Sequence, residues 1–213
     1  MRVKRKSSKQ IALDKRLHMQ QARAQSVLTS GTLVAKASCH QGDATFGCAA
    51  GKQCTSNVLQ FFISSETQNR REWSTDDINN ILQAGAHMYR TIQNAASTTE
   101  TYLLVTELPQ YVEKGGETYK LTLCEPPLAG TLDNKVTDTD AMNFSLIDAL
   151  HQSFLLQNFA FVVIGSNIPS YTIGVHCQNN HFFVFDSHSR NKQGTSSAGG
   201  SAVLLRFANN KMY

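Results

Sequence analysis

Three runs of strand-forming residues follow one another in the last third of the chain, and they constrain the fold more than any other feature. Each is rich in β-branched and aromatic residues, and together they cover Phe159–Ile164, Tyr171–Cys177 and His181–Asp186. Only Gln178-Asn179-Asn180 separates the last two, which predicts a tight hairpin. A Ser/Gly/Asn-rich segment over 187–201, expected to be a loop, leads to a further apolar strand at Ala202–Phe207. Strands connected this closely pair antiparallel, so the chain is expected to end in an antiparallel meander.

The residues before these runs show the spacing of helices. Ser74 is a good N-cap, and Asp76 and Asp77 follow in the first turn, where the helix dipole favours acidic side chains. Apolar residues then recur at helical spacing as far as Ile92. Further helices are predicted over Thr55–Ile63 and Asn143–Phe154, and strands over Thr32–Ala35, Tyr102–Val105 and Thr118–Cys124. Helices that precede a meander favour an α+β fold, with N-terminal helices packed on a mostly antiparallel C-terminal sheet.

The composition is that of an ordinary globular protein. Of the 213 residues, 41% are hydrophobic and 17% are charged, which is enough apolar material for a real core. The longest apolar run, Phe159–Ile164, is far shorter than the ~18 residues that a membrane span requires. The N-terminus also lacks the continuous apolar stretch of a signal peptide. We therefore expect no membrane partner and an intracellular location, in the cytoplasm, the nucleus or both.

Positive charge is concentrated at the N-terminus. The first 25 residues hold eight Lys and Arg against Asp14 alone, a net +7, whereas the whole chain carries +4. The remaining 188 residues are therefore mildly acidic, at −3. We expect residues 1–28 to be a basic flexible arm and residues 29–213 to form the folded domain. The run Lys4-Arg5-Lys6 is typical of a segment that binds nucleic acid or an import receptor, and a solvated, mobile terminus is the alternative.

The cysteines do not indicate a disulfide framework or a metal site. There are five, an odd number, and no Cys-x-x-Cys pair occurs among them. This pattern suits a reducing compartment, and no cofactor is implied. We expect Cys39, Cys48, Cys124 and Cys177 to be small buried hydrophobic residues.

The fifth, Cys54, lies in a setting suited to a nucleophile. A turn of small residues ending at Gly51 precedes it, and a helix is expected to begin just after it. Backbone N–H groups and the positive end of a helix stabilise a thiolate. A Cys before a helix more often only packs there, so this position is a candidate rather than an assignment.

The strand segment Phe182–His188 supplies a candidate base and its partner. Side chains alternate along a strand, so Asp186 and His188 share one face, about 6.5 Å apart along the backbone. A carboxylate at that distance can orient an imidazole, as in catalytic triads. His176 and His181 are rival bases, although neither has a carboxylate as well placed. Gln41, thirteen residues before Cys54, is the candidate oxyanion donor through its side-chain amide.

At these residues the chain resembles the deubiquitinase domain of the herpesvirus large tegument protein, a family of papain-like cysteine proteases. The family element Gly-x-Gln-Cys-x-Ser-Asn is matched from Gly51 to Asn57, and the family Gln thirteen residues before its Cys is matched by Gln41. The family segments Phe-Gly and Ala-Gly are matched by Phe46-Gly47 and Ala50-Gly51. The family strand end Phe-Asp-Pro-His corresponds to Phe185–His188, with Ser187 in place of Pro. Ser187 is expected to point away from the face of Asp186 and His188. The resemblance spans about residues 37–207.

The resemblance implies that residues 29–213 are a papain-like protease domain. The implied activity is that of a monomeric cysteine isopeptidase that cleaves ubiquitin or polyubiquitin chains after the C-terminal Gly-Gly of ubiquitin. Cys54 would be the nucleophile, His188 the base, Asp186 its orienter and Gln41 the oxyanion donor. Asp43, Asp76 and Asp77 are candidates for binding the basic tail of such a modifier, or are simply caps and turn formers. A cysteine protease or acyltransferase with another substrate, and a non-catalytic module that binds ubiquitin or nucleic acid, are the alternatives.

Overall fold

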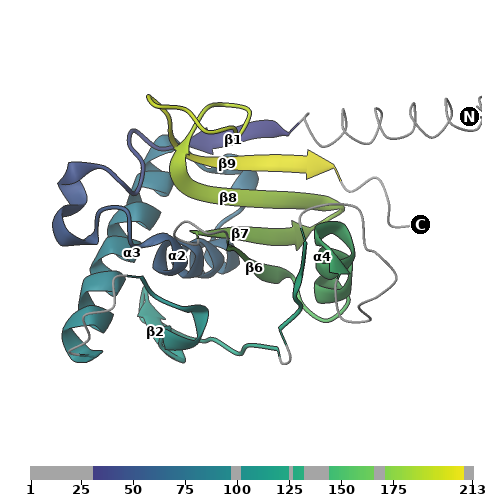
Figure 1. Cartoon of the computed structure of the whole chain (residues 1–213), viewed down its shortest axis with the longest axis horizontal. Coiled ribbons are helices and arrows are strands. Elements are labelled where there is room, and N and C mark those ends of the chain that lie inside the picture. Colours follow the sequence, from purple (N-terminus) through teal and green to yellow (C-terminus); the bar gives the residue numbers. More distant parts are fainter. Residues whose placement is uncertain (1–30, 97–101, 125–126, 132–143, 166–170, 209–213) are drawn as a thin grey trace, which may run out of the picture.

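A five-stranded antiparallel sheet organises the computed structural model, which describes residues 31–96, 102–124, 127–131, 144–165 and 171–208 (Figure 1). Its strand order is β1-β9-β8-β7-β6. The strands are β1 (Thr32–Lys36), β6 (Phe159–Ile164), β7 (Tyr171–Gln178), β8 (His181–Arg190) and β9 (Ser201–Ala208). The predicted C-terminal meander is therefore confirmed. The basic arm expected over 1–28 and a polar loop expected over 132–139 lie outside the described residues.

The turn between β7 and β8 follows the sequence prediction closely. Asn179 and Asn180 adopt positive φ angles of 48° and 58°, the conformation that a two-residue type I′ hairpin requires. Asn tolerates this left-handed region better than most residues. The hairpin fixes the register in which Gln178 faces His181.

The end of β8 differs from the prediction. The strand does not stop at Asp186 but continues to Arg190, so the expected loop over 187–201 begins four residues later. Its pairing with β9 shifts register between Asp186 and Arg190, which marks a bulge, and Figure 1 shows β8 bending at this end. His188 is therefore held within a strand rather than in a loop.

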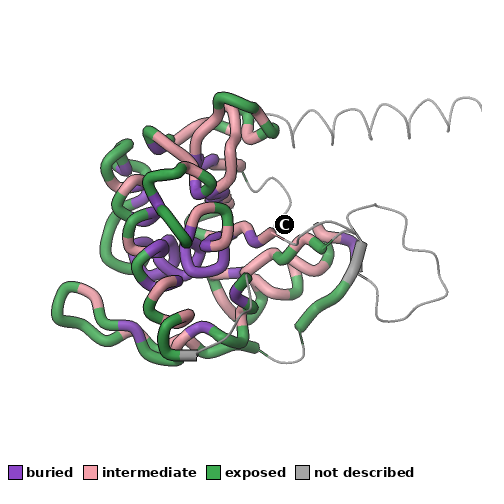
Figure 2. Tube along the Cα trace, turned by 60° about the vertical axis from the view of Figure 1, so that its left-hand side comes forward, coloured by how far each residue is buried: buried purple, intermediate pink, exposed green. Residues whose placement is uncertain are grey.

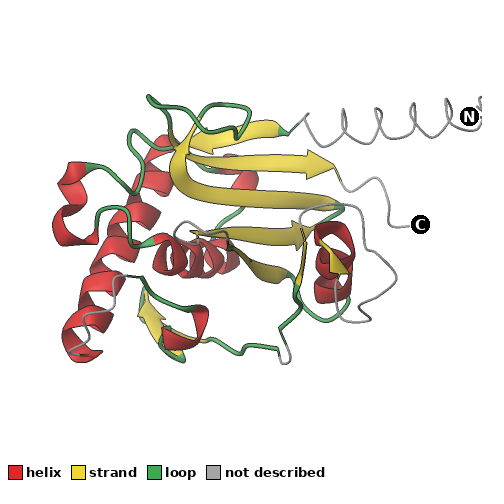
Figure 3. Ribbon diagram, in the orientation of Figure 1, coloured by secondary structure: helices red, strands yellow, loops and turns green. Residues whose placement is uncertain are grey.

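Two long helices lie beside the sheet, and a shorter one lies next to β6 (Figure 3). They are α2 (Cys54–Thr67), α3 (Thr75–Ala96) and α4 (Leu146–Phe154). The N-terminus of α3 is capped by Ser74, whose hydroxyl accepts from the Asp77 N–H while Asp77 accepts from the Ser74 N–H. The three predicted helices are present. α2 runs four residues beyond its predicted end, and α4 begins at Leu146 rather than Asn143, because Phe144 and Ser145 form a short strand.

Two predicted strands were wrong or too long. Tyr102–Val105 is not a strand; the carbonyl of Leu103 accepts the Thr55 hydroxyl, and a short 3₁₀ helix, η3 (Val105–Glu107), follows. The strand predicted over Thr118–Cys124 is only β3 (Glu117–Lys120), paired with β2 (Tyr111–Lys114) in a separate hairpin. Apolar residues in both segments pack against the core from loops, which strand periodicity does not distinguish. Short 3₁₀ helices η1 (Ala44–Ala49) and η2 (Arg70–Glu72) and the parallel pair of β4 (Gly130–Thr131) and β5 (Phe144–Ser145) complete the described elements.

The core forms where α2 crosses the sheet, and Figure 2 shows the buried positions gathered in this central region. Phe61 of α2 stacks on Phe185 of β8, with ring centroids 5.1 Å apart, and meets Trp73 edge-on at 5.8 Å. Gly174 of β7 allows this close approach. A Cβ atom there would lie 2.9 Å from side-chain atoms of Phe61 and Val58. The core thereby fixes α2 against the strands that carry the candidate base.

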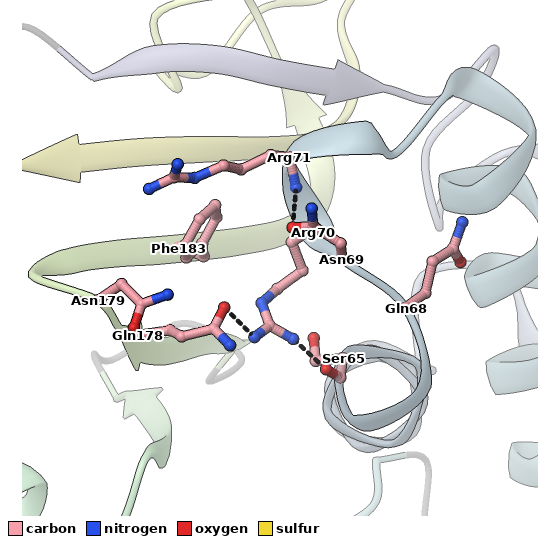
Figure 4. Close-up of a pocket in the computed structure, with 8 residues that line it drawn as sticks. All are labelled: Ser65, Gln68, Asn69, Arg70, Arg71, Gln178, Asn179 and Phe183. Carbon is pink, nitrogen blue, oxygen red and sulfur yellow. Dashed lines mark hydrogen bonds between the residues drawn. The ribbon is translucent and has the colours of Figure 1, made fainter.

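The C-terminal end of α2 is held by a buried arginine (Figure 4). Arg70 is 2% exposed, and its guanidinium donates to the Ser65 carbonyl and, at 2.6 Å, to Oε1 of Gln178. The same group lies 5.6 Å from the centre of the Phe183 ring. These contacts connect α2 to both strands of the β7–β8 hairpin beside a pocket of about 330 Å³.

All five cysteines are free thiols, and the prediction that Cys39, Cys48, Cys124 and Cys177 are buried was wrong for all four. Cys48 and Cys124 are exposed, and Cys39 and Cys177 are partly exposed. Both exposed thiols lie in short or irregular segments where the sequence carries no periodic burial pattern. Among the helices of the described ranges, none combines the length and apolar character needed to cross a membrane.

Candidate active site

Cys54 is the first residue of α2 and lies at the buried N-terminal end of that helix. The preceding Gly51 has a φ of +77°, a conformation that glycine adopts without strain and that lets the chain turn into the helix. The thiol is hydrogen-bonded to the His188 ring and to Thr172 of β7. Burial raises the pKa of the Cys54 thiol, but these hydrogen bonds and the charge of His188 outweigh burial, so the pKa falls below its ordinary value.

His188 and Asp186 lie on the same face of β8 and contact each other directly. The distance from His188 Nδ1 to Asp186 Oδ1 is 2.7 Å, and the His188 N–H also donates to that oxygen at 2.9 Å. Because Nδ1 is engaged by the carboxylate, Nε2 is the nitrogen left to face a reacting group. The strand prediction that Asp186 and His188 share a face therefore describes the observed arrangement.

The charges of this pair favour an ionised site. Burial lowers the pKa of His188, but its hydrogen bond to the Asp186 carboxylate and its interaction with Cys54 outweigh burial and raise the pKa to about 9. Hydrogen bonds and the charge of His188 likewise outweigh the burial of Asp186, so its pKa is lowered. The two shifts therefore favour the Cys54 thiolate and the His188 imidazolium over the neutral thiol and imidazole.

Arg190 was not anticipated from the sequence, yet it completes the carboxylate's surroundings. Its Nε donates to Asp186 Oδ2 at 2.7 Å. The two oxygens of Asp186 therefore have different partners, His188 at Oδ1 and Arg190 at Oδ2. Arg190 is four residues from Asp186 on the same strand face. Period-two alternation would have revealed it if the strand had been predicted to continue past Asp186.

The start of β7 supplies two more neighbours that sequence reasoning missed. The Tyr171 ring meets the His188 ring edge-on, with centroids 5.1 Å apart, and lies 5.7 Å beneath the Arg190 guanidinium. Thr172 Oγ1 is 3.1 Å from Thr55 Oγ1 and also contacts the Cys54 thiol. No motif marks these residues, because their role depends on how β7 pairs with β8.

Gln41 is held against both the strand and the helix of the site. Its backbone N–H donates to the Ser187 carbonyl at 2.8 Å, and its own carbonyl accepts the Gly51 N–H at 2.9 Å. Its side-chain Oε1 accepts from Ser187 Oγ at 3.0 Å and from Asn57 Nδ2 at 3.5 Å. The structure thus places all four predicted residues together, at the junction of the first turn of α2 with the end of β8.

The rival bases lie in unsuitable places. His176 is buried and stacked on Phe159 with ring centroids 4.2 Å apart, and burial together with the Arg70 charge lowers its pKa to about 3. His181 Nδ1 lies 2.7 Å from the carbonyl of Asn179 in the hairpin turn. His176 and His181 lie toward the hairpin end of β7 and β8, where Arg70 contacts Gln178 and Phe183, whereas Cys54 contacts Thr172 at the start of β7.

Two of the three candidate tail-binding acids have structural roles. Asp43 caps η1 by accepting from the Thr45 N–H, and Asp77 belongs to the capping box of α3. Asp76 lies exposed in the first turn of α3. Within the ranges that the structure describes, no cluster of three His, Cys, Asp or Glu side chains has the geometry of a metal site.

The solved structure of a ubiquitin-specific protease encoded by the murine cytomegalovirus tegument protein, in complex with a ubiquitin-based suicide substrate, has the same fold. Its TM-score is 0.64 at 22% identity, covering 82% of this chain and 73% of that one. The α+β, papain-like architecture predicted from the sequence is therefore confirmed.

Curated relatives and a family model agree with this likeness. Large tegument protein deneddylases from human herpesvirus 6B and alcelaphine herpesvirus 1 are 29% and 25% identical over 80% of this chain. The chain spans only 8% and 6% of their lengths. The model of the herpesvirus tegument protein N-terminal conserved region matches residues 36–212. With this match over most of its length, the chain belongs to the family of the herpesvirus tegument protein N-terminal conserved region.

Proposed function

We propose that this domain is a cysteine peptidase that hydrolyses conjugates of ubiquitin or a ubiquitin-like modifier after the modifier's C-terminal Gly-Gly. The observation that carries the proposal is the contact of Cys54 with His188, in which the thiol pKa is lowered and the imidazole pKa is raised. A thiolate beside an imidazolium is the reactive form of a thiol protease. The printed names of the relatives point to the same class of substrate.

The proposed reaction uses each group in turn. The Cys54 thiolate attacks the carbonyl carbon of the terminal glycine, and the His188 imidazolium gives its proton to the departing amine as the C–N bond breaks. Water then attacks the thioester, His188 takes the proton of that water, and the thiolate leaves. Asp186 keeps Nε2 of His188 directed at Cys54 throughout, because Nδ1 stays hydrogen-bonded to its carboxylate.

Gln41 is proposed as the oxyanion donor in both steps. Its Oε1 is occupied by two donors, Ser187 and Asn57, which leaves the Nε2 hydrogens to face the developing negative charge. A donor aimed at charge that exists only in the transition state raises kcat more than it lowers KM.

The test uses two covalent probes, each carrying an electrophile at the C-terminus of the modifier. One is built on ubiquitin and the other on the modifier that deneddylases remove. We expect an adduct with at least one probe, located at Cys54 by peptide mass mapping. Cys54→Ala should give none, whereas Cys48→Ser, which changes an exposed thiol, should react like the unaltered chain.

Failure of both probes, or an adduct at another cysteine, contradicts the proposal. Preference for one probe distinguishes a deubiquitinase from a deneddylase, the two activities that the relatives' names contain. Hydrolysis of an unrelated acyl reporter alone would favour the alternative of a protease or acyltransferase with another substrate.

We propose a separate role for residues 1–28, as a basic arm that binds nucleic acid or an import receptor and brings the domain to the nucleus as well as the cytoplasm. The segment holds eight of the chain's 20 Lys and Arg residues against a single acidic residue, and none of the candidate catalytic residues. Its deletion should leave reporter hydrolysis within about a few-fold and abolish salt-sensitive binding to nucleic acid. Loss of hydrolysis on deletion would instead show that the arm is part of the folded domain.

A further inference from the structure

Ser187 lies between Asp186 and His188 in β8 and points to the opposite side of the strand. Its side chain is fully buried, and its hydroxyl lies 3.0 Å from Oε1 of Gln41. A Pro at this position, as in the viral motif, has no hydroxyl and could not make this contact. One short strand segment therefore contacts both the base and the oxyanion donor.

The main-chain hydrogen bonds of Gln41 hold its backbone but do not fix its side-chain amide. Two main-chain hydrogen bonds, to Ser187 and from Gly51, fix the Cα position. The amide itself has two contacts, Ser187 Oγ at 3.0 Å and the longer one from Asn57 Nδ2 at 3.5 Å. Within the part of the chain that the structure describes, Nε2 of Gln41 donates no hydrogen bond. Ser187 therefore provides the shorter of the two hydrogen bonds that hold the amide in place, whereas Asn57 Nδ2, which can only donate, selects Oε1 as the end that faces inward.

We propose that Ser187 is a positioning residue that holds the Gln41 side chain where Asn57 Nδ2, which can only donate, keeps Oε1 turned inward and leaves Nε2 to face the oxyanion. The inference rests on the proposed function, because it concerns the oxyanion donor of that reaction. A Gln amide has an acceptor end and a donor end of similar size and can rotate by half a turn. In the reverse orientation, Oε1 would repel the developing negative charge and Nε2 would face the Nδ2 donor of Asn57.

The first test removes the hydroxyl. Ser187→Ala should lower kcat about tenfold, the effect of losing one hydrogen bond, and leave KM within about twofold. This loss is smaller than the roughly 10²–10³ expected for Gln41→Ala, because the amide in Ser187→Ala still spends part of its time correctly oriented. The matched control is Ser189→Ala, which removes a hydroxyl on the same strand that bonds to the Ser197 carbonyl and not to Gln41. It should leave kcat nearly unchanged.

A double-mutant cycle tests whether Ser187 acts through Gln41. In a Gln41→Ala background, Ser187→Ala should cost no further activity, because the group that it positions is absent. Equal losses in both backgrounds would overturn the proposal, and so would a loss confined to KM or an unchanged kcat. Melting curves of each variant separate these effects from unfolding.

A spectroscopic test does not depend on catalysis. The side-chain amide resonances of Gln41, assigned by their disappearance in Gln41→Ala, should shift and become more mobile in Ser187→Ala but not in Ser189→Ala. Unaltered Gln41 resonances in Ser187→Ala would overturn the positioning role. If neither covalent probe reacts with the unaltered protein, the proposed function fails, while these resonances still decide whether Ser187 holds the amide.

Discussion

Cys54 and His188 show which electrostatic effect prevails at the scale of single residues. For each group, burial is the largest single influence and favours the neutral form. The thiol would remain protonated and the imidazole unprotonated if burial acted alone. For the Cys54 thiol, the hydrogen bonds with His188 and Thr172 and the charge of His188 outweigh burial. For the His188 imidazole, the Asp186 carboxylate and Cys54 outweigh it. The ionised pair therefore depends on Asp186 as much as on the contact between the two groups themselves.

A pH profile follows from these shifts. Because the pKa of His188 is raised to about 9, kcat/KM should hold across neutral pH and decline as pH rises through about 9, when the imidazolium is lost. At low pH it should decline as the thiolate is protonated, at a pH below the ordinary range of a thiol. The two limbs belong to the coupled pair rather than to either residue. Hydrolysis of a fluorogenic modifier reporter from about pH 5 to about pH 10 measures both limbs.

Asp186→Asn provides the matching control for the profile. The Asp186 hydrogen bond is the strongest influence that raises the pKa of His188, so its loss should move the alkaline limb to lower pH. An alkaline limb that stays in place in this variant would show that Asp186 does not set the charge of His188.

Arg190 should matter for activity although it does not reach Cys54. Arg190→Gln removes the Nε donor from Asp186 Oδ2 and the contact with Tyr171, which frees the carboxylate to rotate away from His188. We expect kcat/KM to fall about tenfold, corresponding to about 1.4 kcal/mol. Arg206→Gln on β9, which removes an arginine at the opposite end of the sheet, is the matched control. Equal effects of the two substitutions would indicate a general loss of positive charge rather than support of Asp186.

At the scale of elements, β8 shows both what the sequence predicts and what it leaves out. The strand is identified by the alternation of Phe183 and Phe185. The shared face of the candidate base and its orienter is identified by the spacing of Asp186 and His188. The continuation to Arg190 could not be predicted, because Ser, His, Ser and Arg have no apolar alternation; the strand persists there through a bulged pairing with β9. The contact from Ser187 to Gln41 joins residues 146 positions apart. No local sequence pattern predicts a contact between residues so far apart. The motifs around Cys54 and from Asp186 to His188 are local, so they could be recognised from the sequence.

The placement of α2 depends on the missing side chain at Gly174. In Gly174→Ala, the new methyl would lie 2.9 Å from Phe61 and Val58 side-chain atoms, so the helix must shift away from β7. We expect a loss of about 1–3 kcal/mol in the free energy of unfolding, together with reduced activity because Cys54 moves with α2. Gly165→Ala is the control, since a Cβ there meets open space and should leave stability almost unchanged. Chemical denaturation of both variants measures the difference. Equal stabilities would show that α2 and β7 can accommodate a methyl group between them.

At the scale of the whole molecule, α2 connects the candidate active site at its N-terminal end to the contacts of the buried Arg70 at its C-terminal end. Its first residue is the candidate nucleophile, and Ser65 near its other end is bound by Arg70, about 16 Å away along the helix axis. Burial lowers the pKa of Arg70 to about 10, so the guanidinium still carries its charge at neutral pH. Within the described ranges no carboxylate forms an ion pair with it, and carbonyl oxygens and the Phe183 ring surround it instead. The contacts of Arg70, drawn in Figure 4, are therefore at the end of α2 opposite to Cys54.

This separation predicts that stability and catalysis respond differently at the two ends of α2. Arg70→Ala removes two charge-assisted hydrogen bonds and leaves a cavity between the helix and the β7–β8 hairpin, so the free energy of unfolding should fall by at least about 2 kcal/mol. Arg71→Ala, its exposed neighbour on the same pocket, should change that free energy by less than about 0.5 kcal/mol. Below the melting temperature, both variants should keep kcat within about twofold, because β8 and the N-terminal turn of α2 hold the four site residues independently of Arg70. A large loss of kcat in folded Arg70→Ala would mean that the position of Cys54 is set from the far end of the helix.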